Sequence, residues 1–437
     1  MSWLRSTAVR FRSRRAQSLV MFAIFLVALV LFAGLAIDLG FAYLTRASLS
    51  KAVDAACLTG VRTLPLGRSQ AETLARASFA ANYSQNALGV GLPSVGVAFE
   101  TDTDGNLLVN VSATTSINTF FVRILPQWKT LTVSANGEAT RVKVDMPLVL
   151  DRSGSMLANG GAAALPQAVS SFVDLFSEET DKVGVFSFAS NARQDVLLKQ
   201  PFKTDVKNAV NNWPAISQGR TFADGGLRLA YGAFTNGTVG GVSAAVRIVV
   251  FFTDGYANTF QDTFACSAPT NYNFAANDGP HDSPDSASKY GGAFLDPSTG
   301  SIITCPSDPN CGFSANLDAR GAPPVCPITS FNSVDPSHPV KSVSWANVWS
   351  EGQLRALATA TAMRTDPNLR VTIYAIGLGG SIDKAFLKTM ANDKDTIPGS
   401  VYDPSQPSGS AVFAPTPGDL QSVFQTIASK ILLRLTR

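Results

Sequence analysis

Residues 144–156 read V-D-M-P-L-V-L-D-R-S-G-S-M, and this stretch decides the fold expected for the chain. An apolar run of strand length ends abruptly at Asp151, and Ser153, Gly154 and Ser155 follow it. Strands buried in a parallel sheet are almost continuously apolar, and ligands of such sheets bind beyond the carboxyl ends of the strands. The stretch therefore predicts a buried parallel strand that leads into a ligand-binding loop.

A second apolar run ends in the same way. Residues 247–254 read R-I-V-V-F-F-T-D, so Asp254 follows a strand that should lie in the same sheet as Asp151. Carboxylates and hydroxyls are hard oxygen donors, which suit Mg²⁺, Mn²⁺ or Ca²⁺ better than zinc or copper. Asp and Ser at this spacing also occur in ordinary turns, so the triplet Asp151, Ser153 and Ser155 alone leaves a purely structural interpretation open.

The rest of residues 143–437 alternates between the helix period and the strand period. After the first strand we expect strands at 182–189, 246–253 and 370–378, and a short segment near 195–198. Helices are expected at 162–176, 203–213, 222–233, 346–364, 382–392 and 417–435. Alternating strands and helices are typical of an α/β fold with a doubly wound, mostly parallel sheet.

These residues resemble the von Willebrand factor A domain. The pattern of that family is D-x-S-x-S after the first strand, a Thr between two later helices and T-D-G after a further strand. The resemblance implies a metal-ion-dependent adhesion site formed by Asp151, Ser153, Ser155, Thr221 and Asp254, with Arg220 in place of a usual Gly. It implies Mg²⁺, with Mn²⁺ or Ca²⁺ as alternatives, and adhesion through the metal to a Glu or Asp of a protein partner.

A membrane-crossing helix is expected near the N-terminus. Residues 19–37 are apolar throughout, which is long enough to span the hydrocarbon core at about 1.5 Å per residue. Five arginines stand before this run, at positions 5, 10, 12, 14 and 15, so residues 1–18 should be cytoplasmic and the rest of the chain outside the cytoplasm. A cleavable signal peptide is the competing interpretation, although no A-x-A site follows.

Residues 14–64 resemble the N-terminal region of TadE/TadG-like proteins of tight-adherence (Flp) pilus assembly. The D-L-G at 38–40 and the A-V-D-A-A at 52–56 are the most specific parts. Pseudopilins of that system carry a Gly and a Glu where this chain has Ala16 and Met21, whereas the larger TadG-like members resemble it in also having an A domain. The resemblance implies a single-pass protein of the bacterial inner membrane, with its bulk in the periplasm.

Residues 38–142 should form a small α+β domain. A helix is expected to extend outward from the membrane and turn before residue 86, and a hairpin is expected around residues 95–99 and 107–111. A strand at 131–142 completes the domain. The Ala-rich face at Ala47, Ala52, Ala55 and Ala56 could pack closely against another helix or cover this domain's own sheet, and Cys57 is expected to be a buried thiol.

Residues 257–342 are rich in Gly, Pro, Asn, Asp and Ser and should be an elaborated loop inserted outside the sheet. It contains Cys266, Cys305, Cys311 and Cys326, which predict two disulfides outside the cytoplasm. Zinc is the alternative, but no C-x₂-C pair occurs, and His281 and His338 lack ligand spacing.

The composition and the missing motifs exclude several function classes. A net charge of +3 is too small to indicate nucleic-acid binding. Ser153 and Ser155 have no His or Lys partner in the motif, so the chain is not expected to be an enzyme. Two functions remain open: a pilus-assembly or adhesion component that binds a partner such as a pilin or pseudopilin through the metal, and a structural envelope protein in which the metal only stabilises the fold.

Overall fold

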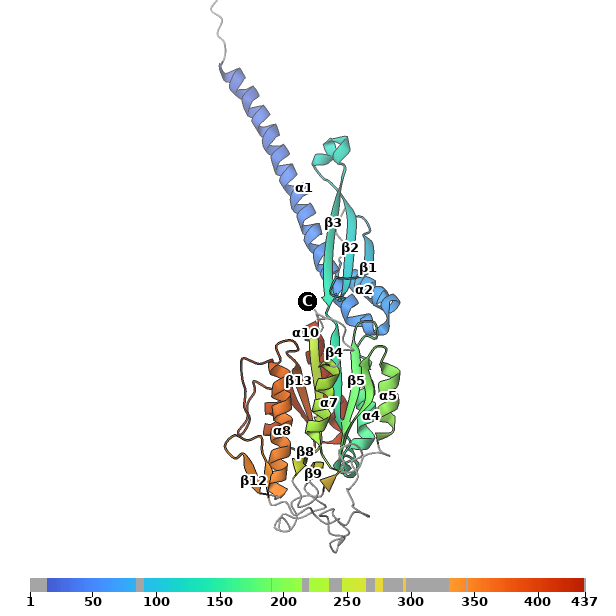
Figure 1. Ribbon diagram of the computed structural model, residues 1–437. Coiled ribbons are helices and arrows are strands. Elements are labelled where there is room, and N and C mark those ends of the chain that lie inside the picture. Colours follow the sequence, from blue (N-terminus) through green and yellow to red (C-terminus); the bar gives the residue numbers. More distant parts are fainter. Residues whose placement is uncertain are drawn as a thin grey trace, which may run out of the picture. The chain divides into compact units, whose positions relative to one another are not determined.

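The computed structural model describes residues 14–83, 90–189, 191–213, 220–235, 246–264, 272–277, 294–295, 330–342 and 345–435. The chain divides into two compact units (Figure 1). The first comprises residues 1–100 and 108–139, and the second comprises residues 101–107 and 140–437.

The first unit is built on one long helix, α1 (Arg14–Thr63). The large apolar residues between Leu19 and Phe32 are exposed, and a buried stripe begins only at Gly34. The stripe continues through Asp38, Thr45 and Leu49 at the three-to-four-residue spacing of a helix face. Among the described residues, α1 is the one helix long and apolar enough to cross a membrane.

The remainder of the first unit covers the second half of α1. A short 3₁₀ turn, η1 (Leu64–Leu66), leads to α2 (Arg68–Asn82), and β1 (Ser94–Thr101), β2 (Leu107–Asn118) and β3 (Thr130–Arg141) form a three-stranded sheet in that order. The predicted hairpin is confirmed. Ala52 and Ala56 are fully buried, so the Ala-rich face is covered within this unit, and Cys57 is a buried thiol as expected.

The second unit contains a six-stranded sheet with the order β14-β13-β7-β4-β5-β6. Its strands are β4 (Val144–Asp151), β5 (Lys182–Phe188), β6 (Ala192–Lys199), β7 (Val246–Thr253), β13 (Thr372–Leu378) and β14 (Ser410–Ala414). All neighbouring pairs are parallel except β5 and β6. The sheet is therefore mostly parallel, as predicted, and mixed through its β6 edge.

Helices cover both faces of this sheet. Alternate residues of its strands point to opposite faces and belong to two separate hydrophobic cores. Leu148 and Phe252 belong to one core, while Val149 and Phe251 belong to the other. Helices α4 (Gly161–Val173), α5 (Lys203–Asn211) and α10 (Leu420–Leu435) close the first core, and α7 (Ala223–Thr235), α8 (Trp345–Thr365) and α9 (Lys384–Met390) close the second. The doubly wound arrangement is confirmed.

Strand β14 was not predicted. The segment 410–414 reads S-A-V-F-A and follows a run of Ser, Pro and Gly, so its sequence resembles a loop. It forms a strand because its backbone pairs with the edge of β13, from Tyr374 opposite Ser410 to Leu378 opposite Ala414. A tertiary contact therefore decides this element, and local propensity does not.

The insertion contributes no described strand to the six-stranded sheet, as expected, but it is not a loop throughout, because its described strands pair into small sheets of their own. Its described parts are β8 (Thr259–Phe264), β9 (Tyr272–Asn277) and β10 (Phe294–Leu295) in one small sheet, and β11 (Ser330–Asn332) and β12 (Val340–Ser342) in another. Cys266, Cys305, Cys311 and Cys326 lie outside the described residues, as does His281. The two disulfides consequently stay a prediction.

Candidate metal centre

The carboxylate of Asp151 lies fully buried at the end of β4, with a fixed orientation. Its Oδ1 accepts a hydrogen bond from the Ser153 backbone N–H at 2.7 Å. Its Oδ2 accepts one from the Thr253 hydroxyl at 2.6 Å. Trp213 Nε1 also donates to the Asp151 carbonyl oxygen at 3.0 Å. Two neighbouring strands and a buried indole thus position one carboxylate.

A chain of side-chain contacts joins this carboxylate to the end of β7. The hydroxyl oxygens of Ser153 and Ser155 lie 2.9 Å apart, and the Ser155 hydroxyl donates to Asp254 Oδ1 at 2.6 Å. Asn159 Nδ2 donates to the second oxygen of Asp254 at 3.0 Å. Helix α3 (Gly154–Ala158) begins directly after Ser153 and contains Ser155. Four of the five predicted site residues are therefore brought together.

The fifth residue, Thr221, is attached to the same region through its backbone. Its N–H donates to Asn258 Oδ1 at 2.8 Å, and its carbonyl accepts from the Asn258 N–H at 3.2 Å. Thr221 is buried, and within the described residues its side chain forms no hydrogen bond to the other four. The structure thus places Thr221 beside the loop that follows Asp254 without joining its hydroxyl to the others.

The electrostatics of the site are unfavourable to two negative charges. Burial raises the pKa of Asp151 to about 7, and the negative charge of Asp254 adds to the shift. Burial also raises the pKa of Asp254 above its ordinary value. The hydrogen bonds that these carboxylates accept come from hydroxyls, a side-chain amide and a backbone N–H. None of those donors carries a positive charge that would offset the cost of burial.

The nearest basic residue in the sequence is directed elsewhere. Arg152 is buried, and its Nε donates to Ser187 Oγ at 3.1 Å while its Nη2 donates to Asn191 Oδ1 at 2.6 Å. Burial lowers the pKa of the Arg152 guanidinium from its ordinary value. Arg152 therefore fastens the end of β4 to β5 and its following loop, and it does not bond to either carboxylate.

A divalent cation fits this donor set. Two carboxylates and the hydroxyls of Ser153 and Ser155 are the hard oxygens that Mg²⁺, Mn²⁺ and Ca²⁺ accept. A positive charge between Asp151 and Asp254 would favour the ionised form of both carboxyls. Within the described residues no group of three or more His, Cys, Asp or Glu could hold a metal, and this site is no exception, so its donors are two carboxylates and neutral hydroxyls.

Sequence reasoning missed the residues that hold the two carboxylates in place. Thr253 is the first residue of the T-D-G motif, so its position was visible, but its hydroxyl faces Asp151 across the sheet and not its neighbour Asp254. Asn159 lies four residues after Ser155, one helical turn, which is a weak signal because Asn is common at helix ends. Trp213 gave no local signal, since it reaches Asp151 from a distant part of the chain.

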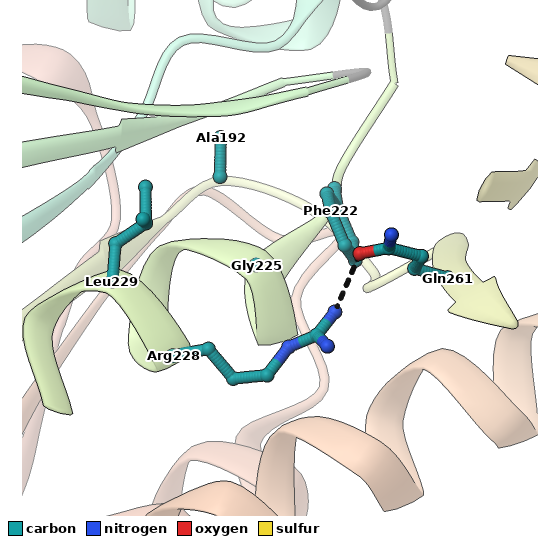
Figure 2. Close-up of a pocket in the computed structure, with 6 residues that line it drawn as sticks. All are labelled: Ala192, Phe222, Gly225, Arg228, Leu229 and Gln261. Atoms are coloured by element: carbon teal, nitrogen blue, oxygen red, sulfur yellow. Dashed lines mark hydrogen bonds between the residues drawn. The ribbon is translucent and has the colours of Figure 1, made fainter. Parts of the chain in front are cut away.

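A pocket of about 260 Å³ lies beside α7 and is lined by Ala192, Phe222, Gly225, Arg228, Leu229 and Gln261 (Figure 2). Figure 2 shows the Arg228 side chain extended toward Gln261, to which it donates at 3.2 Å. The same guanidinium pairs with Asp224 at 3.0 Å. None of the five predicted site residues lines this pocket, so the pocket is not the candidate metal centre.

Two family models match separate segments of the chain. Residues 145–271 match the von Willebrand factor type A domain, and residues 17–63 match the TadE/G-like Flp pilus-assembly family. The chain therefore carries a von Willebrand factor type A domain behind a TadE/G-like N-terminal region, as both sequence resemblances predicted. The A-domain match begins at β4 and ends before α8. No curated protein matches the chain.

Several solved structures are similar to the chain. The vWF domain of the type V pili tip protein Mfa5 from Porphyromonas gingivalis is 20% identical, with 68% of this chain and 97% of that chain covered and a TM-score of 0.39. The pilus adhesin SpaC from Lactobacillus rhamnosus GG is 14% identical, with 79% and 35% covered and a TM-score of 0.40. Proximal thread matrix protein 1 from the mussel byssus, with a zinc-occupied MIDAS motif, is 16% identical, with 67% and 48% covered and a TM-score of 0.36. This chain thus spans less than half the length of the last two.

Proposed function

We propose that this chain is a membrane-anchored component of pilus assembly or adhesion that binds a protein partner through a divalent cation. The ligands are Asp151, Ser153, Ser155, Thr221 and Asp254, and Mg²⁺ is the expected ion, with Mn²⁺ or Ca²⁺ as alternatives. The observation that carries the proposal is the pair of buried carboxyls, linked through hydroxyls, in which the pKa of Asp151 is raised to about 7. Such a pair favours the arrival of a positive charge.

The donor set also supports a role in binding and not in catalysis. When bound, the cation supplies a positive charge that only two carboxylates offset, together with a coordination position for an acidic side chain of a partner. The hydroxyls of Ser153 and Ser155 bond to each other and to Asp254, so we assign them as ligands and not as nucleophiles. Asp151 and Asp254 hold the charge, and Thr253 and Asn159 orient them.

The surroundings of the site favour a protein partner over a small anion. Leu157, two residues after Ser155, is 56% exposed, and Tyr256, two residues after Asp254, is 38% exposed. The Tyr256 ring stacks on Trp349 with centroids 5.3 Å apart. Apolar and aromatic side chains beside a charged centre are typical of protein interfaces. Pilins or pseudopilins with an exposed Glu or Asp are the partners that the TadE/G-like region suggests.

The anchor belongs to the same proposal. We infer that α1 crosses the bacterial inner membrane once, with residues 1–18 in the cytoplasm and the A domain in the periplasm, because five arginines precede the apolar run. Alkaline phosphatase fused after Arg437 should therefore be active, and a cytoplasmic reporter at the same point should be silent. The reverse result would contradict this topology.

The test measures partner binding of the full-length chain in lipid nanodiscs to purified pilins and pseudopilins. Binding should occur in Mg²⁺ and disappear in EDTA and in Asp151→Asn. Asp205→Asn is the matched control: Asp205 is a half-exposed carboxylate on α5 in an ion pair with Lys199, and its loss should leave binding unchanged. Circular dichroism in EDTA should show an intact fold. Binding that survives EDTA would favour the alternative in which the site only stabilises an envelope protein.

A further inference from the structure

The connection between β2 and β3 exposes a run of large apolar side chains. It contains two 3₁₀ turns, η2 (Val122–Ile124) and η3 (Pro126–Trp128). The exposed fractions range from 45% to 76% at Phe120, Phe121, Ile124, Leu125 and Trp128. Five such residues within nine positions form a contiguous apolar tip, and contiguous exposed apolar surface marks an interaction site. We call residues 120–128 the apolar tip.

Three backbone hydrogen bonds hold the apolar tip to α1. The carboxylate of Asp38 is buried and accepts from the N–H groups of Phe120 at 2.7 Å, Phe121 at 3.0 Å and Val122 at 2.7 Å. The rings of Phe41 and Phe120 also meet edge to face, with centroids 5.6 Å apart. Both α1 and the tip belong to the first unit, so these bonds fix the position of the tip along the helix axis, next to Asp38.

The attachment reaches into the apolar stretch that is expected to cross the membrane. Gly34 lies inside residues 19–37, and a Cβ added there would come within 2.6 Å of Phe121 Cβ. Gly34 therefore lets the Phe121 side chain lie directly on the helix backbone. Four residues of helix, about 6 Å, separate Gly34 from Asp38, so the Phe121 side chain reaches about one helical turn inside the end of the apolar run.

The composition of the apolar tip matches that depth. Aromatic residues such as Trp128 are enriched where a protein crosses the boundary between headgroups and acyl chains. Arg123 and Lys129 are exposed on the same connection, and their positive charges suit lipid phosphates. The large apolar side chains of α1 between Leu19 and Phe32 are exposed. The exposed apolar side chains of the tip therefore extend the apolar surface of the helix.

We propose that the apolar tip inserts into the lipid bilayer beside α1, as a second membrane contact of the first unit. The tip enters the leaflet from which the Asp38 end of α1 emerges, with Ile124, Leu125 and Trp128 among the acyl chains. The proposal rests on α1 crossing the membrane, and it adds that the membrane also fixes the tilt and rotation of the first unit. A single membrane-crossing helix leaves the tilt and the rotation of the unit free, whereas a second membrane contact beside the helix restricts them.

The test uses Trp128 as its own probe. The full-length chain is reconstituted into vesicles of phosphatidylcholine and phosphatidylglycerol, with or without bromine atoms near the headgroup end of the acyl chains. The emission of the parent minus that of Trp128→Phe isolates the Trp128 component. Bromine should quench this component at least about two-fold, since an interfacial segment is buried roughly 5–10 Å into the headgroup and acyl boundary. Trp213, which is fully buried in the second unit, provides the control: the component isolated with Trp213→Phe should be unaffected by bromine.

Flotation of the vesicles separates the two ways in which the proposal can fail. Protein that floats with the vesicles but shows no quenching of the Trp128 component would overturn the insertion of the tip while leaving the α1 anchor intact. Blue-shifted emission in that case would mean that another protein surface covers the tip. Protein that does not float would contradict the anchor itself, and the tip proposal with it.

Discussion

Two buried acidic sites in the second unit differ in how their charge is satisfied. Glu351 on α8 is fully buried, and its oxygens accept from Ser333 Oγ at 2.5 Å, from the Val334 N–H at 3.0 Å and from Arg355 Nε at 2.8 Å. Burial alone would raise the pKa of Glu351, but the hydrogen bonds from Ser333 and Arg355 outweigh it and hold the pKa below its ordinary value. At Asp151, burial and the neighbouring Asp254 raise the pKa to about 7.

We interpret this difference as one between a structural contact and the proposed cation site. The donors around Glu351 include two cationic side chains, so the charge is already compensated and the residue fastens the β11–β12 hairpin to α8. The donors around Asp151 and Asp254 are neutral, so the negative charge of the two carboxylates is not compensated and a cation would stabilise it. We interpret only the second arrangement as a site for a cation.

The largest expected effect is the loss of stability when Glu351, the carboxylate with cationic partners, is removed. Glu351→Ala leaves the Arg355 guanidinium without its carboxylate and should lower the free energy of unfolding by about 3–5 kcal/mol. Chemical denaturation of the full-length chain measures this. Asp205→Asn removes a half-exposed ion pair with Lys199 and should change stability by less than about 1 kcal/mol. Equal effects of the two variants would mean that burial does not distinguish these carboxylates.

The pH dependence of this effect has a defined sign. An acid whose pKa is lowered in the folded state stabilises the fold above its unfolded pKa, and this stabilisation is lost as the pH falls through the folded pKa. The difference in stability between the parent and Glu351→Ala should therefore be constant at neutral pH and shrink below the ordinary pKa of 4.5.

The next effect has the opposite sign, because the Asp151 pKa is raised. Such an acid stabilises the fold below its unfolded pKa of 3.8 and loses that contribution as the pH rises through the folded value of about 7. In EDTA, Asp151→Asn should match the parent near pH 4 and exceed its stability near pH 8 by on the order of 2–4 kcal/mol. The amide keeps an oxygen for the Ser153 N–H, so the loop should be retained.

Thermal or chemical denaturation across this pH range checks the prediction. Saturating Mg²⁺ should remove the advantage of the variant, because ligand binding stabilises only the folded parent. A difference between parent and Asp151→Asn that is independent of pH would show that the charge of Asp151 is not the origin of the effect.

The smallest expected effect concerns a residue that only orients the site. Thr253→Val removes the hydroxyl that donates to Asp151 Oδ2 and should weaken cation binding by roughly ten-fold, as is usual for residues behind the metal ligands. Thr253→Ser restores the hydroxyl and should bind as the parent does. Calorimetric titration with Mn²⁺ measures both variants. If Thr253→Ser were as weak as Thr253→Val, the loss would come from packing in β7 and not from the hydrogen bond.

The sequence predicted the parts of this molecule that depend on local pattern. The strands that end at Asp151 and Thr253 are continuous apolar runs, and the D-x-S-x-S and T-D-G motifs follow them directly, so both the sheet and four of its converging residues could be foreseen. The apolar run at 19–37 and its outward continuation as a helix were also expected, and α1 contains both.

The missed features all depend on contacts between distant residues. Strand β14 exists because β13 offers an edge, and Trp213 reaches Asp151 from a position 62 residues away. Asp38 was visible as part of D-L-G, but its three acceptor contacts with residues 120–122 require the folded connection between β2 and β3. No periodicity within a single segment encodes such pairings.

The binding of a divalent cation by the full-length chain tests the central claim most directly. In a titration with Mn²⁺ followed by electron paramagnetic resonance, the signal of the free ion should fall until one equivalent is bound, and Mg²⁺ should restore it by competition. Asp151→Asn and Asp254→Asn should lose this binding, and Asp205→Asn should keep it. Equal Mn²⁺ binding by the parent and Asp151→Asn, or no binding by either, would contradict the assignment of the cation site to the ends of β4 and β7.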